Sequence, residues 1–542
     1  MLGLITFLII KMPFYVIEPQ IKVEDSAVVV SIKSDHLLKM PNIYFSGESE
    51  VTQSIGVEAF EPRYLHNIWY RDTVDTFFEF RLTHIRPGEV YYFQIEATDI
   101  EKGKEITSRG YKFRVVERRG KWQQGVVIDL GPYLGDLTEN SVTIAWKTNL
   151  PSAGEVILDN GKIFKDSSLS TWHRVKIPDL KYGKSYIYRI RCVAESDTFE
   201  TRLYRFRIPD PYNFKFSVCG DTRASWKTPG TRERINGVNV HVLRRIAVES
   251  YRDSAAFMIV VGDLIRGYTD DTSFVRIMYE TWLWAIEPVS PFLPIFTVMG
   301  NHDAGAPLVK AGKRAYYDPP PPHSAENYWQ IYFPNPENGP QNRKGHPPYA
   351  GNVYSLRFGP AIFVVLNTDY NQRVSGDTIF SVRLDDIQYR WADSLLSETK
   401  VPYRFVFWHE PLMPSGSHRG SALDTHPEAR DSAAALLFNH SVTALFNAHE
   451  HVYARVSVKP EYFYGSKIFQ NLLRKSEPGS FYQIISGGGG APAGFEEMAR
   501  YVEKFSYEYH FVVVEVTDHA VKFKVKNLLG WTIDEGCLSG CY

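Results

Sequence analysis

Residues 255–263 read AAFMIVVGD, an unbroken apolar run that ends in a Gly-Asp pair. The run is too short for a typical helix, so it predicts a buried strand. The same arrangement occurs at residues 214–221, which read FKFSVCGD. In an α/β domain, side chains just past the carboxyl ends of strands gather at one edge of the sheet. Asp221 and Asp263 are therefore predicted to lie close together.

Three further motifs follow apolar stretches in the same way. The stretches FLPIFTVM, YRFVFW and SVTALFN precede Gly300-Asn301-His302-Asp303, His409, and His449-Glu450-His451. Each motif alone is a weak signal, because a Gly-Asp pair is most often a turn and two alternating histidines often face solvent. Five such motifs in one order, each after a predicted strand, are improbable by chance.

These residue types are the ligands that a two-metal phosphoesterase needs. Two divalent ions about 3.5–4 Å apart can activate water, neutralise phosphoryl oxygens and stabilise the leaving oxygen. We expect Asp263 to bridge the two ions, since its two oxygens can serve different metals. Asp221 and His451 would complete the first site, and Asn301, His409 and His449 the second. His302 is a candidate to contact phosphate or to protonate the leaving group.

The N-terminal part contains an internal repeat. Residues 80–97 (FRLTHIRPGEVYYFQIEA) and 175–192 (VKIPDLKYGKSYIYRIRC) align without a gap at an offset of 95 residues. Each copy has an apolar alternation, a Gly-containing turn and a strand with alternating aromatics, and an offset near 95 residues fits one small β-sandwich per copy. Both copies resemble fibronectin type III domains, which we place at 20–118 and 123–209. The charged segment 117–125 is predicted to join them.

From residue 213 to residue 542 apolar strands alternate with helix-like segments such as 238–253 and 384–398. This alternation predicts an α/β domain with a largely parallel sheet. Strands return after residue 482, and we expect them to complete the second sheet of this domain.

The region 214–527 resembles the calcineurin-like metallophosphoesterase superfamily, and especially its purple acid phosphatase-like branch. Beyond the ligands, the resemblance rests on ENYWQIYFP with NVYSLRFGPAIFVVLNTD, on HEPLMPSGSH, on AHEHVYAR and on YQIISGGGGAP. It implies a four-layer α/β/β/α sandwich after the two all-β sandwiches, and hydrolysis of phosphate esters by a metal-bound hydroxide. It adds His418 as a substrate-contacting residue. The ligand set has no thiolate and suits two ions of Fe, Mn or Zn.

Three positions depart from the family pattern. Arg223 stands where many members carry a histidine ligand of the first metal, and Arg266 stands where purple acid phosphatases carry their tyrosine. We therefore expect a colourless protein in which Tyr268, Asn239, His241 or water fills the first metal's vacancy. Arg223 and Arg266 could each clamp phosphate or form a structural ion pair. The third departure is Ala448, which replaces a glycine and is tolerable unless the backbone there needs a positive φ.

Composition limits the partners and the compartment. The net charge is −1, so charge does not favour binding to nucleic acid, and a small phosphate ester is the expected substrate. Residues 1–19 form an apolar leader that is too short for a transmembrane span. It is either a degenerate export signal or a first strand. Sandwich domains and this leader favour secretion, the periplasm or the cell envelope, and Cys537 and Cys541 are candidates for a local disulfide.

The leading interpretation is thus a dinuclear phosphomonoesterase. Two alternatives stay open. A phosphodiesterase or nucleotidase would use the same ligands with a different pocket. A cell-surface binding protein with a degenerate catalytic domain would explain the loss of one ligand at the first site.

Overall fold

The computed structural model describes most of the chain, and the described residues are 18–51, 64–101, 103–195, 197–225, 234–269, 271–304, 325–343, 347–370, 373–375, 378–380, 382–416, 418–420, 422–494 and 497–541. Nearly all of the predicted leader, residues 1–17, lies outside these ranges. Within them, no helix has the length and apolar character that crossing a bilayer requires.

The first sandwich holds eight strands in the order β1-β2-β5-β7-β8, with β3 and β4 on β2 and β6 on β5. Its long second strand pairs with four others, so it belongs to both halves of the sandwich. Buried and half-buried residues alternate along β5, as the sequence predicts. The elements are β1 (Gln20–Glu24), β2 (Ala27–Gly47), α1 (Glu48–Val51), β3 (His66–Trp69), β4 (Val74–Leu82), β5 (Val90–Asp99), β6 (Lys104–Thr107), β7 (Tyr111–Arg118) and β8 (Lys121–Gln124).

The second sandwich holds six strands in the order β11-β10-β12-β13, with β9 on β10 and β14 on β12. The fully buried Trp146 lies in its core. Its strand β12 begins 95 residues after the start of β5, which is the offset of the sequence repeat. The strands are β9 (Ile128–Gly135), β10 (Val142–Leu158), β11 (Ile163–Ile177), β12 (Ser185–Val193), β13 (Thr198–Glu200) and β14 (Tyr204–Arg207).

The predicted linker 117–125 is instead part of the first sandwich. Its residues close a hairpin between β7 and β8, with Arg118 paired to Lys121. Arg119 and Gly120 both have positive φ, at 50° and 73°, which a two-residue hairpin turn requires. The charged composition suggested a linker, but the local turn chemistry decides the structure.

The C-terminal region contains two stacked sheets. The first runs β19-β18-β15-β29-β30-β31 and the second β20-β21-β24-β25-β27-β26-β28. Phenylalanines fill the space between the sheets, with Phe216 against Phe405 at a ring distance of 5.2 Å. The strands of the first sheet are β15 (Asn213–Cys219), β18 (Ala255–Val261), β19 (Ile295–Val298), β29 (His510–Thr517), β30 (Val521–Asn527) and β31 (Thr532–Ser539). Those of the second are β20 (Tyr354–Phe358), β21 (Ala361–Val365), β24 (Tyr403–Phe407), β25 (Ala444–Asn447), β26 (Tyr453–Val458), β27 (Phe481–Ser486) and β28 (Val502–Ser506).

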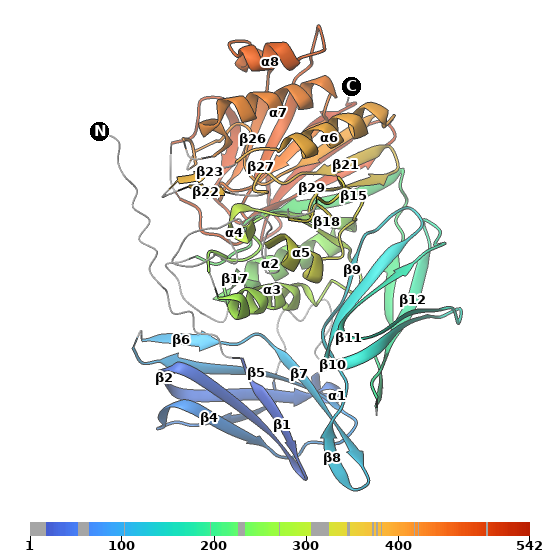
Figure 1. Ribbon diagram of the computed structural model, residues 1–542, viewed down its shortest axis with the longest axis vertical. Helices are drawn as coiled ribbons and strands as arrows, with labels where there is room; N and C mark the ends of the chain where they lie inside the picture. Colours follow the sequence, from blue (N-terminus) through green and yellow to red (C-terminus); the bar gives the residue numbers. More distant parts are fainter. Residues whose placement is uncertain are drawn as a thin grey trace.

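Helices cover both outer faces, which gives the predicted α/β/β/α layering (Figure 1). Helices α2 and α3 pack on the first sheet, while α6 and α7 pack on the second. The helices are α2 (Val240–Arg252), α3 (Thr272–Ile286), α4 (Asn301–Ala304), α5 (Ala325–Tyr332), α6 (Asp386–Glu398), α7 (Pro427–Asn439) and α8 (Lys467–Leu472). Short elements complete the domain: β16 (Arg234–Ile235), β17 (Val238–Asn239), β22 (Arg373–Ser375), β23 (Thr378–Phe380), η1 (Leu423–Thr425) and η2 (Pro460–Tyr462).

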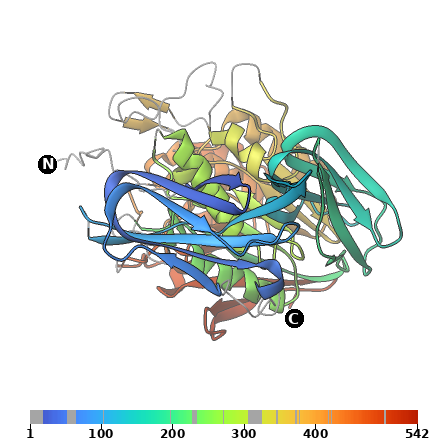
Figure 2. The same cartoon turned by 90° about the horizontal axis from the view of Figure 1, so that it is seen from below.

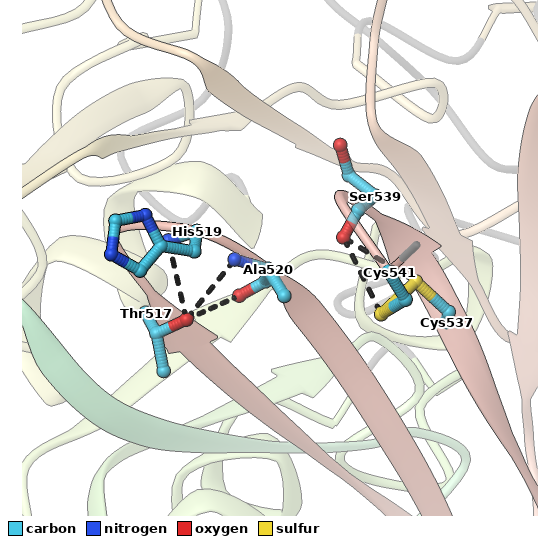
Figure 3. Close-up of a disulfide and its surroundings, with 6 residues drawn as sticks. All are labelled: Thr517, His519, Ala520, Cys537, Ser539 and Cys541. Atoms are coloured by element: carbon cyan, nitrogen blue, oxygen red, sulfur yellow. Dashed lines mark hydrogen bonds between the residues drawn. A yellow bond between two sulfur atoms is a disulfide. The ribbon is translucent and has the colours of Figure 1, made fainter.

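The return strands differ from the prediction. Strand β27 joins the second sheet, but β29 to β31 extend the first sheet, where β29 pairs antiparallel with β15. The valine-rich β29 is buried along most of its length because its side chains pack alternately into the cores on the two faces of the sheet. Disulfide formation between Cys537 and Cys541, which the sequence suggested, is seen at the end of β31 (Figure 3).

A buried ion cluster ties the three domains together. Arg109 of the first sandwich reaches Asp129 of the second at 2.8 Å and Glu280 of α3 at 3.0 Å. Lys147 also pairs with Glu280, at 2.6 Å. Seen from below, the first sandwich lies across the α3 side of the catalytic domain and the second lies at its flank (Figure 2).

Candidate metal centre

The six predicted ligands all follow strand ends at one edge of the two sheets. Asp221, Asp263 and Asn301 come after β15, β18 and β19, which are parallel neighbours. His409 follows β24, and His449 and His451 follow β25, the parallel neighbour of β24. The two stacked sheets thus present their carboxyl ends to a single site, as strand-end placement in the sequence predicts.

Three of these ligand positions have strained backbones. The φ angles are 55° at Asp221, 52° at Asp263 and 69° at His449. Non-glycine residues seldom adopt positive φ, and such residues concentrate at functional sites. Neighbouring glycines permit the close approach. A Cβ on Gly300 would lie 2.5 Å from Oδ1 of Asp263, so no larger residue fits without moving the carboxylate.

The second donor set converges on the amide oxygen of Asn301. Nε2 of His409 lies 3.2 Å from Oδ1 of Asn301, and Nδ1 of His449 lies 3.0 Å from it. Nε2 of His409 is also 3.3 Å from Oδ1 of Asp263. The amide oxygen of Asn301 therefore lies near two imidazole nitrogens, and one of these also lies near a carboxylate oxygen, which are donor types that a metal ion could use.

The first donor set consists of Asp221, Asp263 and His451. Their ligand atoms lie within 4.8 Å of one another. Oδ2 of Asp221 accepts a hydrogen bond of 2.7 Å from the amide of His449, but its buried Oδ1 has no hydrogen-bond partner among the described residues. Burial raises the pKa of Asp221 well above its usual range, and Asp263 adds to this effect. A carboxylate oxygen placed in this way fits a cation.

Hydrogen bonds orient two of the imidazoles for metal binding. Nδ1 of His409 lies 2.9 Å from the carbonyl of Val261, and Nδ1 of His451 lies 2.9 Å from the carbonyl of Pro492. Each ring donates from Nδ1, which leaves Nε2 directed at the site and is the usual arrangement behind a metal ligand. Burial, followed by the charge of Arg223, lowers the pKa of His451 to about 3.

Arg223 lies inside the first donor set. Its Nε donates to Oδ2 of Asp263 at 3.1 Å, and its Nη2 lies 2.9 Å from Nε2 of His451. Burial acts to raise the pKa of Asp263, but His302, His409 and Arg223 hold it well below its usual range. Of the two roles left open for Arg223, the structure has it in the ion pair.

Of the three side chains proposed for the vacancy, two make contacts elsewhere and one is exposed. The hydroxyl of Tyr268 accepts a 2.5 Å hydrogen bond from Nδ2 of Asn301 and so orients a ligand of the second site. Asn239 caps α2 through Val242 and donates to the carbonyl of Gly490. His241 is exposed. The turn through Gly267, whose φ is 53°, directs Tyr268 toward the second donor set. The predicted role required it to face the first donor set.

The remaining candidate residues lie around the ligands. Nε2 of His302 is 3.8 Å from Oδ2 of Asp263, and its Nδ1 donates to the carbonyl of Arg266 at 2.5 Å. The ring of His418 lies 4.1 Å from that of His449. Burial and the charge of Arg223 lower the pKa of the Arg266 guanidinium to about 9. In the last motif the residue with positive φ is His449 and not Ala448. The backbone at Ala448 therefore does not require a glycine.

Two acidic residues within the motifs have roles that the sequence did not reveal. Asp303 accepts hydrogen bonds from the amides of Gly300 at 3.0 Å and Leu264 at 3.2 Å, which joins two ligand loops. Glu450 accepts from the amides of Ser415 at 2.5 Å and Gly416 at 2.8 Å. In the sequence, the only sign of these roles was that both residues stand next to candidate ligands. Their side chains bond to backbone amides of neighbouring loops.

Comparison with known proteins agrees with this geometry. Residues 214–453 match the calcineurin-like phosphoesterase family. The purple acid phosphatase PPD1 from seeds of yellow lupin (Lupinus luteus) is similar at a TM-score of 0.58, with 15% sequence identity over 94% of this chain and 92% of that one. PhoD is similar at a TM-score of 0.51, with 11% identity over 77% of this chain and 92% of that one. These identities show a shared fold alone.

No curated protein sequence matches the chain. The family match covers the strands that carry the ligands and includes both histidines of the last motif. Residues 214–453 are therefore a calcineurin-like metallophosphoesterase domain, which makes this region a phosphoester hydrolase domain, and it follows two all-β sandwiches.

Proposed function

We propose that this protein hydrolyses small phosphate monoesters at a centre of two metal ions. The observation that carries the proposal is the pair of donor sets that share Asp263. Its Oδ1 lies beside Nε2 of His409, and its Oδ2 lies toward His302 and the first site. A carboxylate shared in this way could serve two metal ions, which a two-metal phosphoesterase requires.

Asp221, Asp263 and His451 would hold the first ion, and Asn301, His409, His449 and Asp263 the second. Bound metals would supply Lewis acidity, which activates water and neutralises phosphoryl oxygens. The donors are carboxylate, amide and imidazole, so the proposed ions are Fe, Mn or Zn.

His302 is proposed to handle the proton at the leaving oxygen. Its Nδ1 is fixed by the carbonyl of Arg266, so Nε2 is the nitrogen that can exchange a proton. His418, whose ring lies 4.1 Å from that of His449, is proposed to donate a hydrogen bond to a phosphoryl oxygen. Arg223 would serve as an added phosphate clamp once free of its ion pair, because its planar fork suits phosphate.

The test is elemental analysis of the purified protein beside hydrolysis of a chromogenic phosphate monoester and a diester. Two metals per chain, and faster monoester hydrolysis that Asp263→Asn abolishes, are expected. Faster diester hydrolysis would favour the phosphodiesterase alternative. Failure to bind metal and to hydrolyse either ester, with Mn, Zn or Fe added, would leave the binding-protein alternative.

We also propose that the protein works outside the cytoplasm, in the envelope or secreted. The Cys537–Cys541 disulfide supports this placement, because disulfides persist in oxidising compartments (Figure 3). Labelling of free thiols in protein taken directly from its native source tests it: only buried Cys192 and Cys219 should label after denaturation. Labelling of all four would place the protein in a reducing compartment.

A further inference from the structure

The Arg223 guanidinium uses the same two lone pairs that a first metal would need. One belongs to Oδ2 of Asp263, which accepts from Nε at 3.1 Å. The other belongs to Nε2 of His451, which lies 2.9 Å from Nη2. Because Nδ1 of His451 donates to the carbonyl of Pro492, its Nε2 carries no proton and acts as the acceptor. Two of the three first-site donors are therefore committed to a permanent cation.

The second donor set does not share this constraint. Arg223 bonds to Oδ2 of Asp263, whereas the second set uses Oδ1, which faces Nε2 of His409 at 3.3 Å. The bridging carboxylate thus divides its oxygens between an arginine on one side and three further ligands on the other. Displacing the guanidinium is a requirement for the first ion alone.

We propose that Arg223 competes with the first metal ion, so that the second site fills first and the first ion is held weakly. This inference rests on the proposed function, because it concerns the relative affinities of the two proposed metal sites. The first ion must break two hydrogen bonds of the guanidinium, one of them to a buried carboxylate, and must then lie near a displaced positive charge. Buried charge-assisted bonds of this kind are strong enough to weaken the first site by about 100-fold or more.

Release of Arg223 would also change its role. While it pairs with Asp263 and His451, its donors are directed at protein atoms. When an ion takes its place, the fork becomes available to an anionic substrate beside the same ligands. The side chain would therefore act as a stand-in cation in the protein with one metal and as a phosphate donor in the protein with two.

Titration calorimetry with Mn²⁺ on the full-length, metal-stripped protein tests the proposal, with metal counted by mass spectrometry after dialysis. Wild type should show one tight site and one about 100-fold weaker. Arg223→His, which replaces the guanidinium with an imidazole, should tighten the weaker site by about 100-fold. Arg223→Ala should tighten it by a smaller factor, because it frees the donors without adding one. This second variant keeps the test valid if the histidine variant does not fold.

Arg266→Ala is the matched control. It removes an equal buried charge close enough to influence Arg223, but it frees neither Oδ2 of Asp263 nor Nε2 of His451. It should leave the affinity gap in place. Three outcomes would overturn the competition and leave the proposed function standing. They are equal affinities of the two sites in wild type, unchanged affinities in the Arg223 variants, and an equal gain in affinity of the weaker site in Arg266→Ala. No metal binding in any variant would overturn both.

Discussion

Glu450, which lies between the two histidines of the last motif, accepts a hydrogen bond from the backbone amide of His418 over 3.2 Å. The same carboxylate accepts from the amides of Ser415 and Gly416. Since Glu450 is fully buried, these hydrogen bonds hold the loop that carries His418 in place. One residue between two candidate ligands thus connects the last motif to the placement of His418, the proposed substrate-contacting side chain.

Glu450→Gln should therefore impair catalysis without removing metal. The amide keeps one acceptor oxygen but turns an NH₂ group toward backbone donors, which should cost about 1–3 kcal/mol of stability. Displacement of His418 should lower monoester hydrolysis by about 10- to 100-fold. Steady-state kinetics and metal analysis check this, with the exposed Glu461→Gln as the matched substitution. Loss of a metal ion in Glu450→Gln would show that Glu450 supports the ligands instead of the loop.

The protein should be colourless even when loaded with ferric iron. Arg266 replaces the tyrosine expected to colour purple acid phosphatases, and the hydroxyl of Tyr268 bonds to Asn301 at 2.5 Å beside the second donor set. A visible absorption spectrum of the iron-loaded protein checks this. A charge-transfer band that disappears in Tyr268→Phe would contradict it, because Tyr268 would then ligate iron.

The grouping of the six candidate ligands at one sheet edge was predictable, because each follows a strand end and a strand end can be seen in a sequence as an apolar run that stops at polar residues. Asp263 and Asn301 also come directly after a glycine. The orientation of Tyr268 was not predictable, since it depends on a turn through Gly267 at positive φ. The number of residues between Asp263 and Tyr268 does not show which of the two donor sets the Tyr268 hydroxyl will face.

The supporting carboxylates were missed for a related reason. Glu450 and Asp303 accept hydrogen bonds from backbone amides. Every residue except proline has such an amide, so the sequence does not show which ones a buried carboxylate will meet. The return strands show the same limit at a larger scale. The apolar residues of β29 predict a strand, but only packing decides that it pairs with β15 of the first sheet.

Glu280→Gln should loosen the joint between the three domains. The buried Glu280 carboxylate contacts Arg109 at 3.0 Å, Lys147 at 2.6 Å and Arg276 at 3.3 Å. Neutralising it leaves these cations with less compensating charge, which should cost about 3–5 kcal/mol of folding free energy. Chemical denaturation measures the loss, and small-angle scattering should show a more extended molecule.

Glu200→Gln is the comparison for this change. Glu200 pairs with Arg191 at 2.6 Å, but its side chain is 39% exposed. Solvent screening should limit its effect to less than about 1 kcal/mol. Equal losses in the two variants would mean that burial of the interdomain cluster adds nothing to its stability.

Acid should destabilise the protein through His510. This side chain is fully buried, its Nδ1 lies 2.8 Å from the carbonyl of Glu508, and burial lowers its pKa from about 6.5 to about 4. A lowered pKa means that the unfolded chain binds the proton more tightly than the folded one. The contribution of His510 to stability is therefore complete above about pH 6.5 and is lost as the pH falls toward about 4. The loss should reach about 3 kcal/mol.

The free energy of unfolding, measured by denaturant between pH 4 and pH 7, checks this in wild type and in His510→Phe. Phenylalanine keeps the ring that packs at 5.5 Å from Tyr453 but cannot take up a proton. Other groups also titrate in this range, so the difference between the two proteins is the quantity that isolates His510. That difference should change by about 3 kcal/mol in favour of the variant as the pH falls from 6.5 to 4. A difference that stays constant with pH would show that His510 protonates equally in the folded and unfolded chains.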